Sequence, residues 1–282
     1  MPLHTTRFEG ELGCWTATIW EPAAGDMLAP YVLGIWDFDG VLAQSRERVF
    51  PNGALELIVQ LDEPHRPGAT VGARPFPAVC IGGLRTTSEV VQGPPGRCRV
   101  LGVRLRPVGA FALTGSALDD LRDITVDLRA AVGRDADDLG GSCHAARDGA
   151  ERIRIVIAWI ASRVSRAKHV DARVAWAAAA IDASNGAVAI GALEETVGRR
   201  RMRAGFRSHV GVGPKRLARI VRFRRALELV ANGDGLADAS AGAGYYDQAH
   251  FSTEFRRHAG MTPTAFLSAR RYPDGTSLAE GN

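Results

Sequence analysis

The chain has 282 residues, of which 46% are hydrophobic and 23% are charged, and its formal net charge is +4. This length is enough for about two domains, and the composition is typical of a soluble globular protein. No apolar run approaches the ~20 residues that span a bilayer, and the N-terminus lacks the basic start and apolar core of a secretion signal. We therefore expect a cytoplasmic protein that does not span a membrane.

The region up to about residue 110 is predicted to be rich in β-strands. Residues 54–61 (ALELIVQL) are a short apolar strand candidate, and residues 99–107 alternate, with Val103 and Leu105 on one face and arginines on the other. This period of two predicts a half-buried strand. Clusters of Pro and Gly separate such segments, so we expect short strands in a small barrel or sandwich.

Several aromatic residues of this region are candidates to line a ligand pocket: Trp15, Trp20, Tyr31 and Trp36. A small barrel can hold one small ligand. The alternative is that these side chains are ordinary core aromatics. The sequence therefore identifies neither a ligand-binding residue nor an effector.

Residues 34–45 (GIWDFDGVLAQS) carry two carboxylates after an apolar run. Asp37 and Asp39 resemble the first motif of haloacid-dehalogenase-type phosphatases, in which the first carboxylate attacks a phosphoryl group and the second acts as acid or base. Such an enzyme needs a doubly wound α/β core and a later acidic pair for Mg²⁺. No alternation of strands and helices follows residue 45, so we predict a polar turn or strand end here, and no enzyme.

The four cysteines, Cys14, Cys80, Cys98 and Cys143, are scattered without C-x-x-C spacing. In a reducing compartment such cysteines are free thiols. Their spacing does not indicate a structural metal, and no His-x-His or His/Glu cluster indicates a metal-dependent oxygenase. We expect neither a metal nor a cofactor.

The pattern becomes helical from about residue 110. Residues 165–169 (SRAKH) are predicted to be a linker, after which Asp171 is placed as the N-cap of a helix and Gly186 lies just past its end. Before residue 190, helices are predicted over residues 109–123, 128–133, 148–167 and 171–186.

Basic residues are concentrated in one segment. Residues 196–225 contain eleven Lys or Arg and no Asp or Glu, which leaves 24 basic and 31 acidic residues elsewhere, a net charge of −7. A solvated helix face usually mixes both signs, because Glu–Lys pairs support a helix. The segment therefore indicates an anionic partner, either nucleic acid or an anionic membrane.

Within this segment, residues 198–211 predict an amphipathic helix. Met202 and Phe206 share the inner face, with His209 nearby. The outer face carries Arg200, Arg203, Ala204 and Arg207. A long connecting helix with a basic outer side is predicted to follow over residues 213–233.

Residues 236–263 predict a helix-turn-helix. Gly244 allows a tight turn, and Asp247 is placed to cap a second helix. Phe251 and Phe255 point inward as core residues rather than as stacking platforms, and His250 is a surface residue rather than a catalytic one. The outer face carries Gln248, Ala249, Thr253 and Arg256.

This last region resembles the AraC/XylS-type transcriptional regulator domain over roughly residues 171–270. The family's C-terminal signature is matched by Gly244-Tyr245, Asp247-Gln248, His250-Phe251, Phe255-Arg256-Arg257, Gly260 and Thr262-Pro263. The N-terminal part is similar to a sensor-like domain of some members, through Pro51-Asn52-Gly53 and the segment GVRLRPVGAFALTG.

The resemblance implies an α+β protein in three parts. A β-rich, barrel-like sensor or dimerisation domain ends in helices and spans residues 1–168. An all-α domain with two helix-turn-helix units joined by a linker helix spans residues 169–272, and residues 273–282 form a flexible tail. Each unit would place a recognition helix in the major groove, with half-sites about 10 bp or ~34 Å apart.

By position, the resemblance also implies the DNA contacts. Base contacts fall on Arg200, Arg203 and Ala204 in the first unit and on Gln248, Ala249 and Thr253 in the second. Phosphate contacts, which position without specifying, fall on Arg199, Arg201, Arg207, Lys215, Arg256 and Arg257.

The leading helix of the first unit, residues 190–198, departs from the family pattern. Glu195 and Thr196 stand where the family has an apolar residue and a turn glycine, and Gly198 replaces the usual Ser or Thr cap. Either the turn is altered or this helix is shorter.

The partners that the resemblance implies are double-stranded DNA and RNA polymerase, and it allows a small-molecule effector and a homodimer. A regulator that has lost its ligand response and only dimerises is the remaining alternative. The sequence does not separate an activator from a repressor.

Overall fold

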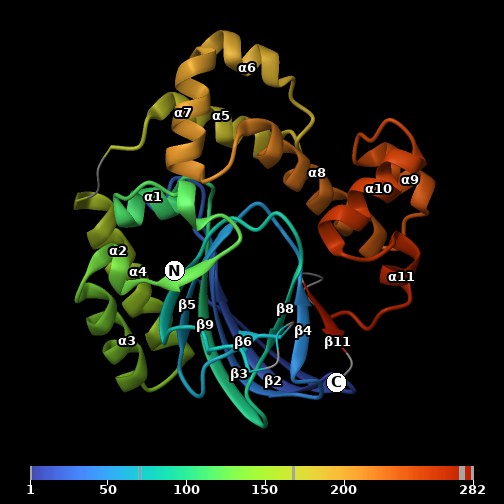
Figure 1. Ribbon diagram of the computed structural model, residues 1–282. Coiled ribbons are helices and arrows are strands. Elements are labelled where there is room, and N and C mark those ends of the chain that lie inside the picture. The colour runs from blue at the N-terminus through green and yellow to red at the C-terminus, as the bar shows by residue number, and fades with distance from the viewer. Residues whose placement is uncertain (1, 69, 71, 167–168, 273–276, 281–282) are drawn as a thin grey trace.

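The computed structural model describes residues 2–68, 70, 72–166, 169–272 and 277–280. Over these residues the chain is α+β, as predicted, with a β-rich N-terminal part and an all-α C-terminal part (Figure 1). The predicted domain boundary at residue 168 and part of the predicted linker fall on residues 167–168, which lie outside the described residues.

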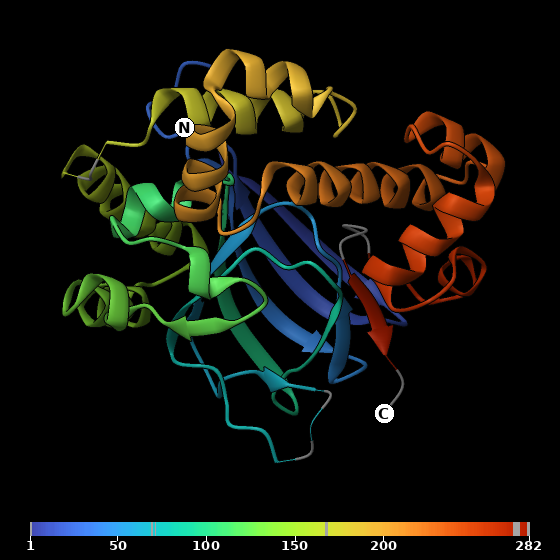
Figure 2. The same cartoon turned by 45° about the horizontal axis from the view of Figure 1, so that its top comes forward.

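The described strands form two antiparallel sheets that do not join into one closed barrel (Figures 1 and 2). The larger, seven-stranded sheet contains, in spatial order, β1 (His4–Gly10), β2 (Gly13–Trp20), β3 (Val32–Leu42), β9 (Arg97–Leu105), β5 (Leu55–Gln60), β7 (Val79–Gly82) and β10 (Thr125–Asp127). The smaller, four-stranded sheet contains β11 (Ser277–Glu280), β4 (Arg46–Val49), β8 (Glu89–Gln92) and β6 (Arg66–Pro67).

The strands predicted from the sequence are present as β5 and β9, but β9 is more buried than its alternation suggested. It lies between β3 and β5, and Val100, Leu101, Gly102 and Val103 are all buried. Gly102 points to the face opposite the helices, and the ring of Trp36 on β3 covers it, since a Cβ there would lie 2.2 Å from that ring.

Helices cover one face of the larger sheet. They are α1 (Gly109–Thr114), the 3₁₀ turn η1 (Asp119–Leu121), α2 (Arg129–Val132), α3 (Asp135–Ala145) and α4 (Gly149–Arg166). Ile153, Val156 and Ile160 follow helical spacing along α4, are fully buried, and join the core formed by the strands. The helix α3 was not predicted.

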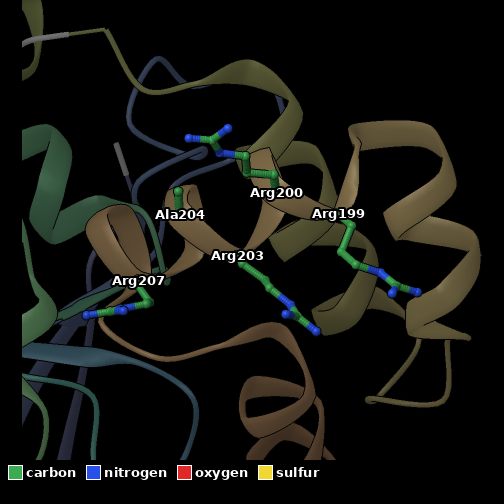
Figure 3. Close-up of a pocket in the computed structure, with 5 residues that line it drawn as sticks. All are labelled: Arg199, Arg200, Arg203, Ala204 and Arg207. Carbon is green, nitrogen blue, oxygen red and sulfur yellow. The ribbon is translucent and has the colours of Figure 1, made fainter.

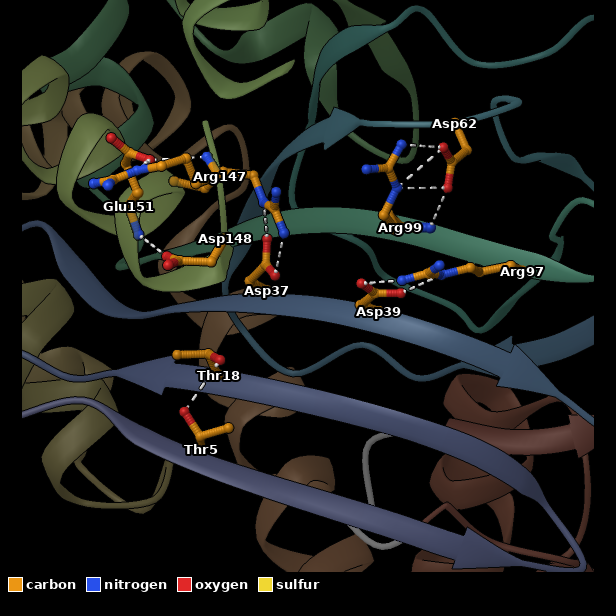
Figure 4. A network of polar contacts seen from close by, with 11 residues as sticks. Thr5, Thr18, Asp37, Asp39, Asp62, Arg97, Arg99, Arg147, Asp148 and Glu151 are labelled. Atoms are coloured by element: carbon orange, nitrogen blue, oxygen red, sulfur yellow. Dashed lines mark hydrogen bonds and ion pairs between the residues drawn. The ribbon is translucent and has the colours of Figure 1, made fainter. Parts of the chain in front are cut away.

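Asp37 and Asp39 lie within β3, so the predicted turn or strand end is wrong. Asp37 is buried and accepts two hydrogen bonds from Arg152 of α4, at 2.6 and 2.9 Å. A Cβ on Gly149 would collide with this carboxylate, so glycine lets the start of α4 approach β3. Asp39 accepts two bonds from Arg97, at 2.7 and 2.8 Å (Figure 4). Both carboxylates are paired, in an antiparallel sheet, so neither has the surroundings that the phosphatase hypothesis requires.

The C-terminal helices agree with the predicted pattern and add α11. They are α5 (Ala172–Ala183), α6 (Ile190–Val197), α7 (Arg199–Val210), α8 (Pro214–Ala231), α9 (Leu236–Gly242), α10 (Gln248–Ala259) and α11 (Pro263–Leu267). Asp171 caps α5 by accepting from Arg173 N at 3.0 Å, as expected. None of the described helices is long and apolar enough to cross a membrane.

The predicted flexible tail differs from the structure where residues 277–280 form β11. This strand pairs along its length with β4, from Ser277 opposite Val49 to Glu280 opposite Arg46. The other residues of the predicted tail, 273–276 and 281–282, lie outside the described residues. The pairing partner is too distant in sequence for a local pattern to reveal it.

The linker helix α8 and the helices that follow it contact the β-rich domain. Phe50, at the end of β4, packs its ring against Phe223 of α8 and Phe266 of α11, with ring centroids 6.4 and 5.7 Å apart. Arg224 of α8 donates to the carbonyl oxygen of Asn52 at 3.3 Å. The segment Pro51-Asn52-Gly53, noted for its resemblance to a sensor-like domain, is therefore a contact between the two domains.

Candidate nucleic-acid interface

The first helix-turn-helix is formed by α6 and α7, which are joined through Gly198 alone. Gly198 adopts φ 89° and ψ 123°, a conformation that L side chains rarely adopt. Leu193 and Val197 of α6 are buried together with the inner face of α7. The turn between the two helices is therefore a single glycine in a conformation with positive φ.

The two faces of α7 have opposite character. Met202, Phe206 and Val210 are fully buried. His209 turns toward the β-rich domain, where its ring lies 3.9 Å from that of Phe111. The outer face forms a shallow hollow in the protein surface (Figure 3), lined by Arg199, Arg200, Arg203, Ala204 and Arg207.

The arginines of α7 differ in their ion pairs. Arg199 pairs with Glu194 at 3.1 Å, Arg201 with Asp171 at 2.8 Å and Arg207 with Asp119 of η1 at 3.2 Å. Within the described residues, neither Arg200 nor Arg203 pairs with an acidic group. The two arginines among the base-contact candidates therefore have no acidic partner in the described part of the chain, whereas the phosphate-contact candidates of this helix each have one.

The second helix-turn-helix is formed by α9 and α10. Gly244 adopts a positive φ of 73° in the turn, and Asp247 caps α10 by accepting from His250 N at 2.7 Å. Tyr245 fills the joint, since its buried ring makes an edge contact with Phe251 at 5.4 Å. The turn glycine and the cap were predicted, because each depends on residues close together in the sequence.

The outer face of α10 is polar and small. Phe251 and Phe255 are fully buried, which confirms them as core residues, and His250 is exposed. The exposed residues of the predicted DNA-binding set are Gln248, Ala249, Thr253, Arg256 and Arg257. Of these, Arg257 lies 3.3 Å from the carboxylate of Glu254.

Comparisons with known proteins agree with this geometry. A family model described as a helix-turn-helix domain matches residues 192–269. Residues 192–269 are a helix-turn-helix domain of the AraC/XylS type. The chain is accordingly a DNA-binding transcriptional regulator. A second model, described as a domain of unknown function (DUF6597), matches residues 21–127 and so covers most of the larger sheet.

Two solved structures resemble the C-terminal part of this chain. The C-terminal domain of AraT, a response regulator from Geobacillus stearothermophilus, is 20% identical, with 36% of this chain and 88% of that chain covered and a TM-score of 0.33. A probable AraC family transcriptional regulator from Rhodopseudomonas palustris CGA009 is 22% identical, covering 34% and 94%, with a TM-score of 0.31.

A likeness that extends over both domains is to ToxT from Vibrio cholerae O395 bound to (E)-4-(8-methylnaphthalen-1-yl)but-3-enoic acid. It is 10% identical and covers 80% of this chain and 94% of that chain, with a TM-score of 0.46. The search of curated proteins gave no match.

The AraC/XylS-type domain contains an ion pair between an exposed arginine and a buried carboxylate, which the sequence did not reveal. Glu254 of α10 is buried, and both of its carboxylate oxygens accept from Arg219 of α8, at 2.7 and 2.8 Å. Although burial opposes ionisation, the hydrogen bonds from Arg219 hold the pKa of Glu254 below its ordinary value. Arg219 belongs to the basic segment, but it fixes the second unit to the linker helix.

The linker helix α8 uses other arginines in the same structural way. Its apolar stripe is buried, as predicted, and Lys215 is exposed in the first turn. Arg222 donates to the carbonyl oxygen of Gly186 at 3.0 Å, and Arg224 pairs with Asp182 of α5 at 3.0 Å. Part of the charge that indicated an anionic partner therefore stabilises contacts between helices.

Tyr246 is an exposed residue of the AraC/XylS-type domain that the sequence analysis did not select. It precedes the cap Asp247, and 93% of its surface is exposed. A phenol can donate a hydrogen bond to a DNA phosphate and pack its ring against sugar or base. Its exposure alone identifies it, since the family signature includes the neighbouring Tyr245, which is buried, and not Tyr246.

The remaining candidates lie in the β-rich domain. All four cysteines are free, as predicted, and burial raises the pKa of Cys80 and of Cys98 to about 12. Trp20 is a core residue, whereas Trp15 is only half-buried and stacks on Phe8 at 4.1 Å. Among the described residues, no group of three or more His, Cys, Asp or Glu could hold a metal ion.

Proposed function

We propose that the protein regulates transcription by placing α7 and α10 in successive segments of the major groove on one face of duplex DNA. The observation that carries this proposal is the arginine-lined outer face of α7, opposite a fully buried apolar face. A helix of this kind has a fixed orientation, and its exposed cations attract the phosphate backbone.

In this proposal the two helices divide the contacts by residue type. Base contacts come from Arg200, Arg203 and Ala204 in the first unit and from Gln248, Ala249 and Thr253 in the second. All are exposed, which supports the assignment. Phosphate contacts come from Arg199, Arg201, Arg207, Lys215, Arg256 and Arg257, which are exposed as well.

The test is binding of the full chain to duplex fragments of its own genome at several salt concentrations. The logarithm of the affinity should fall linearly with that of the salt concentration, because bound phosphates release counterions. Lys215→Ala should reduce the slope by about 1 and weaken binding to all sequences alike. Arg154→Ala, an exposed arginine on α4, is the matched control and should change neither. Absence of duplex binding at low salt would overturn the proposal.

A small effector acting on the β-rich domain is the second part of the proposal. The face of the larger sheet opposite α4 carries the half-buried side chains of Trp36, Phe38 and Ile58. The indole nitrogen of Trp36 is buried without a hydrogen-bond partner in the described part of the chain, which suits a ligand that supplies an acceptor.

This second part is tested by a thermal-shift screen of small molecules, followed by DNA binding. A true effector raises the Tm of the wild-type chain and changes its DNA affinity. Trp36→Phe keeps a ring but removes the N–H group, so it should reduce the Tm shift. An effector that acts equally on both chains would remove Trp36 from this role.

RNA polymerase and a second copy of the chain complete the set of proposed partners. Sedimentation of the protein with and without operator DNA would reveal a homodimer. Transcription from the bound promoter, reconstituted with purified polymerase, would separate activation from repression. An unchanged transcript level at saturating protein would count against a regulatory role.

A further inference from the structure

Arg200 and Arg203 are three residues apart on the outer face of α7, and neither guanidinium group pairs with a carboxylate of the residues that the structure describes. In Figure 3 they spread to either side of the hollow that contains Ala204. A guanidinium fork bonds bidentately to O6 and N7 of guanine, and this is the commonest specific contact in the major groove. The outer face of α7 thus presents two forks whose preferred base is guanine.

The outer face of α10 offers different chemistry in its first two turns. Gln248 is exposed at the start of the helix, and an amide bonds bidentately to N6 and N7 of adenine. Ala249 presents a methyl group, which matches the thymine methyl. Thr253 donates its hydroxyl to the carbonyl oxygen of Ala249 at 2.9 Å, so its own methyl group is the part left for DNA.

The arginines of α10 do not change this preference. Arg256 and Arg257 lie in the last turn, and Arg257 is 3.3 Å from the buried Glu254. In helix-turn-helix proteins the N-terminal residues of the recognition helix contact base edges. The arginines of α10 therefore lie at the end of the helix that is turned away from the bases.

We infer that the operator is asymmetric in composition, with G·C base pairs beneath α7 and A·T base pairs beneath α10. This inference rests on the proposed function, since it assumes that both helices enter the major groove. It adds that each half-site is recognised by one kind of base, guanine by paired forks and adenine–thymine by an amide and methyl groups. The two half-sites are then not interchangeable, and the operator has a direction.

The test is selection of bound duplexes from a random pool by the full wild-type chain and by single variants. Two half-sites one helical turn apart are expected, one rich in G·C and one rich in A·T. Arg203→Ala should lose the preference at one position of the G·C half-site, a discrimination of about 5- to 150-fold. Gln248→Ala should lose the preference at one position of the A·T half-site and leave the G·C half-site unchanged.

Arg203→Lys separates base reading from charge. Lysine keeps the positive charge and the side-chain length but lacks the fork. Affinity for unrelated duplexes should stay near the wild-type value, while discrimination at the guanine position falls. Each variant changes an exposed side chain, and equal Tm values will establish that folding is unaffected. Arg154→Ala is again the control and should select the wild-type sequence.

The outcomes distinguish this inference from the proposed function. Salt-dependent binding to two half-sites of the same composition would overturn the inference and leave the proposed function standing. The same holds if Arg203→Ala alters the A·T half-site instead. If no duplex is bound at low salt, the proposed function fails and the inference fails with it.

Discussion

The first and second helix-turn-helix units share one plan but differ in their turns and outer faces. In both, apolar residues of the second helix are fully buried: Met202 and Phe206 in α7, Phe251 and Phe255 in α10. The first unit connects its helices through Gly198 alone, whereas the second uses the longer segment 243–247 with a capping aspartate. The buried apolar faces determine how the two helices of each unit pack, so the turn between them and the exposed residues can differ from one unit to the other.

The two units also contact the β-rich domain in different ways. The first does so through the end of α7, by the exposed ion pair of Arg207 with Asp119 and the ring contact of His209 with Phe111. It also has a backbone bond, from Leu118 N to the carbonyl oxygen of Ser208 at 2.9 Å. The second uses the buried His258, whose carbonyl oxygen accepts from Ser88 N at 2.7 Å and whose ring nitrogen Nδ1 lies 2.7 Å from the carbonyl oxygen of Thr86. The second contact is the less accessible to water.

The largest effect is expected from removing a core ring of each unit. Phe255→Ala should lower the free energy of unfolding by about 3–5 kcal/mol. We expect a value toward the upper end of this range, because the ring centroid of Phe255 lies 5.3 to 5.7 Å from those of Phe223, Phe251 and Phe266. Phe206→Ala should lower the free energy of unfolding by somewhat less, within the same range, because Phe206 contacts no other aromatic ring among the described residues. Urea unfolding measures the cost, and hydrogen exchange locates it. A larger loss for Phe206→Ala would reverse the comparison.

The turns should differ in their need for glycine. Gly198→Ala should destabilise by about 1–3 kcal/mol, because φ 89° with ψ 123° is sparsely populated for other residues. Gly244→Ala, at φ 73°, should cost about 1 kcal/mol. A Cβ at either position would meet nothing within 4 Å, so the difference reports backbone conformation alone. Thermal unfolding of both variants makes the measurement, and equal costs would show that the two turns are equally strained.

Acid should weaken the second unit in particular. Burial lowers the pKa of His258 below its ordinary 6.5, although its bond to the Thr86 carbonyl and the nearby Glu254 oppose this, while Arg219 and Arg257 reinforce it. As the pH falls, the imidazole of His258 therefore gains a proton in the unfolded chain before it does so in the folded chain. The free energy of unfolding decreases as the pH drops below about 6.5. The same shift at His65, which burial also causes, acts in the β-rich domain.

Hydrogen exchange of α10 between pH 7 and pH 5.5 isolates the effect of His258 from that of His65. After correction for the intrinsic pH dependence of exchange, protection of α10 should fall at the lower pH. His258→Gln removes the titrating group and should flatten this fall, even though it loses the bond to Thr86. A fall that is as steep in the variant would assign the pH dependence to other groups.

The smallest effect is expected from releasing Arg207. Asp119→Asn removes the acidic partner, and because the Arg207 side chain is 73% exposed the pair is worth about 0–1 kcal/mol. DNA affinity should therefore rise by no more than about fivefold, because Arg207 no longer has to leave the carboxylate of Asp119 in order to contact a DNA phosphate. Asp120→Asn changes the neighbouring charge without touching this pair and is the control. An equal rise in both variants would indicate a general charge effect.

Local features of the fold could be predicted from the sequence, and features that depend on distant partners could not. The caps Asp171 and Asp247 and the inward phenylalanines were predicted because their partners lie within a few residues. Asp37 was assigned to a turn because its partner Arg152 is 115 residues away. Glu254 was overlooked because Arg219 lies on another helix, 35 residues before it. The DNA-contact residues were chosen by position, and their exposure now supports that choice without testing it.

The pairing of β11 with β4 has a consequence for how the chain matures. Ser277 bonds to Glu47 across a separation of 230 residues. A ribosome adds about 5–20 residues per second, so one edge of β4 waits roughly 10–50 s for its neighbour. During that interval an unpaired strand edge is open to other nascent chains. The smaller sheet is thus completed only after both DNA-binding units have been synthesised, and a chain truncated before residue 277 would leave this edge permanently open.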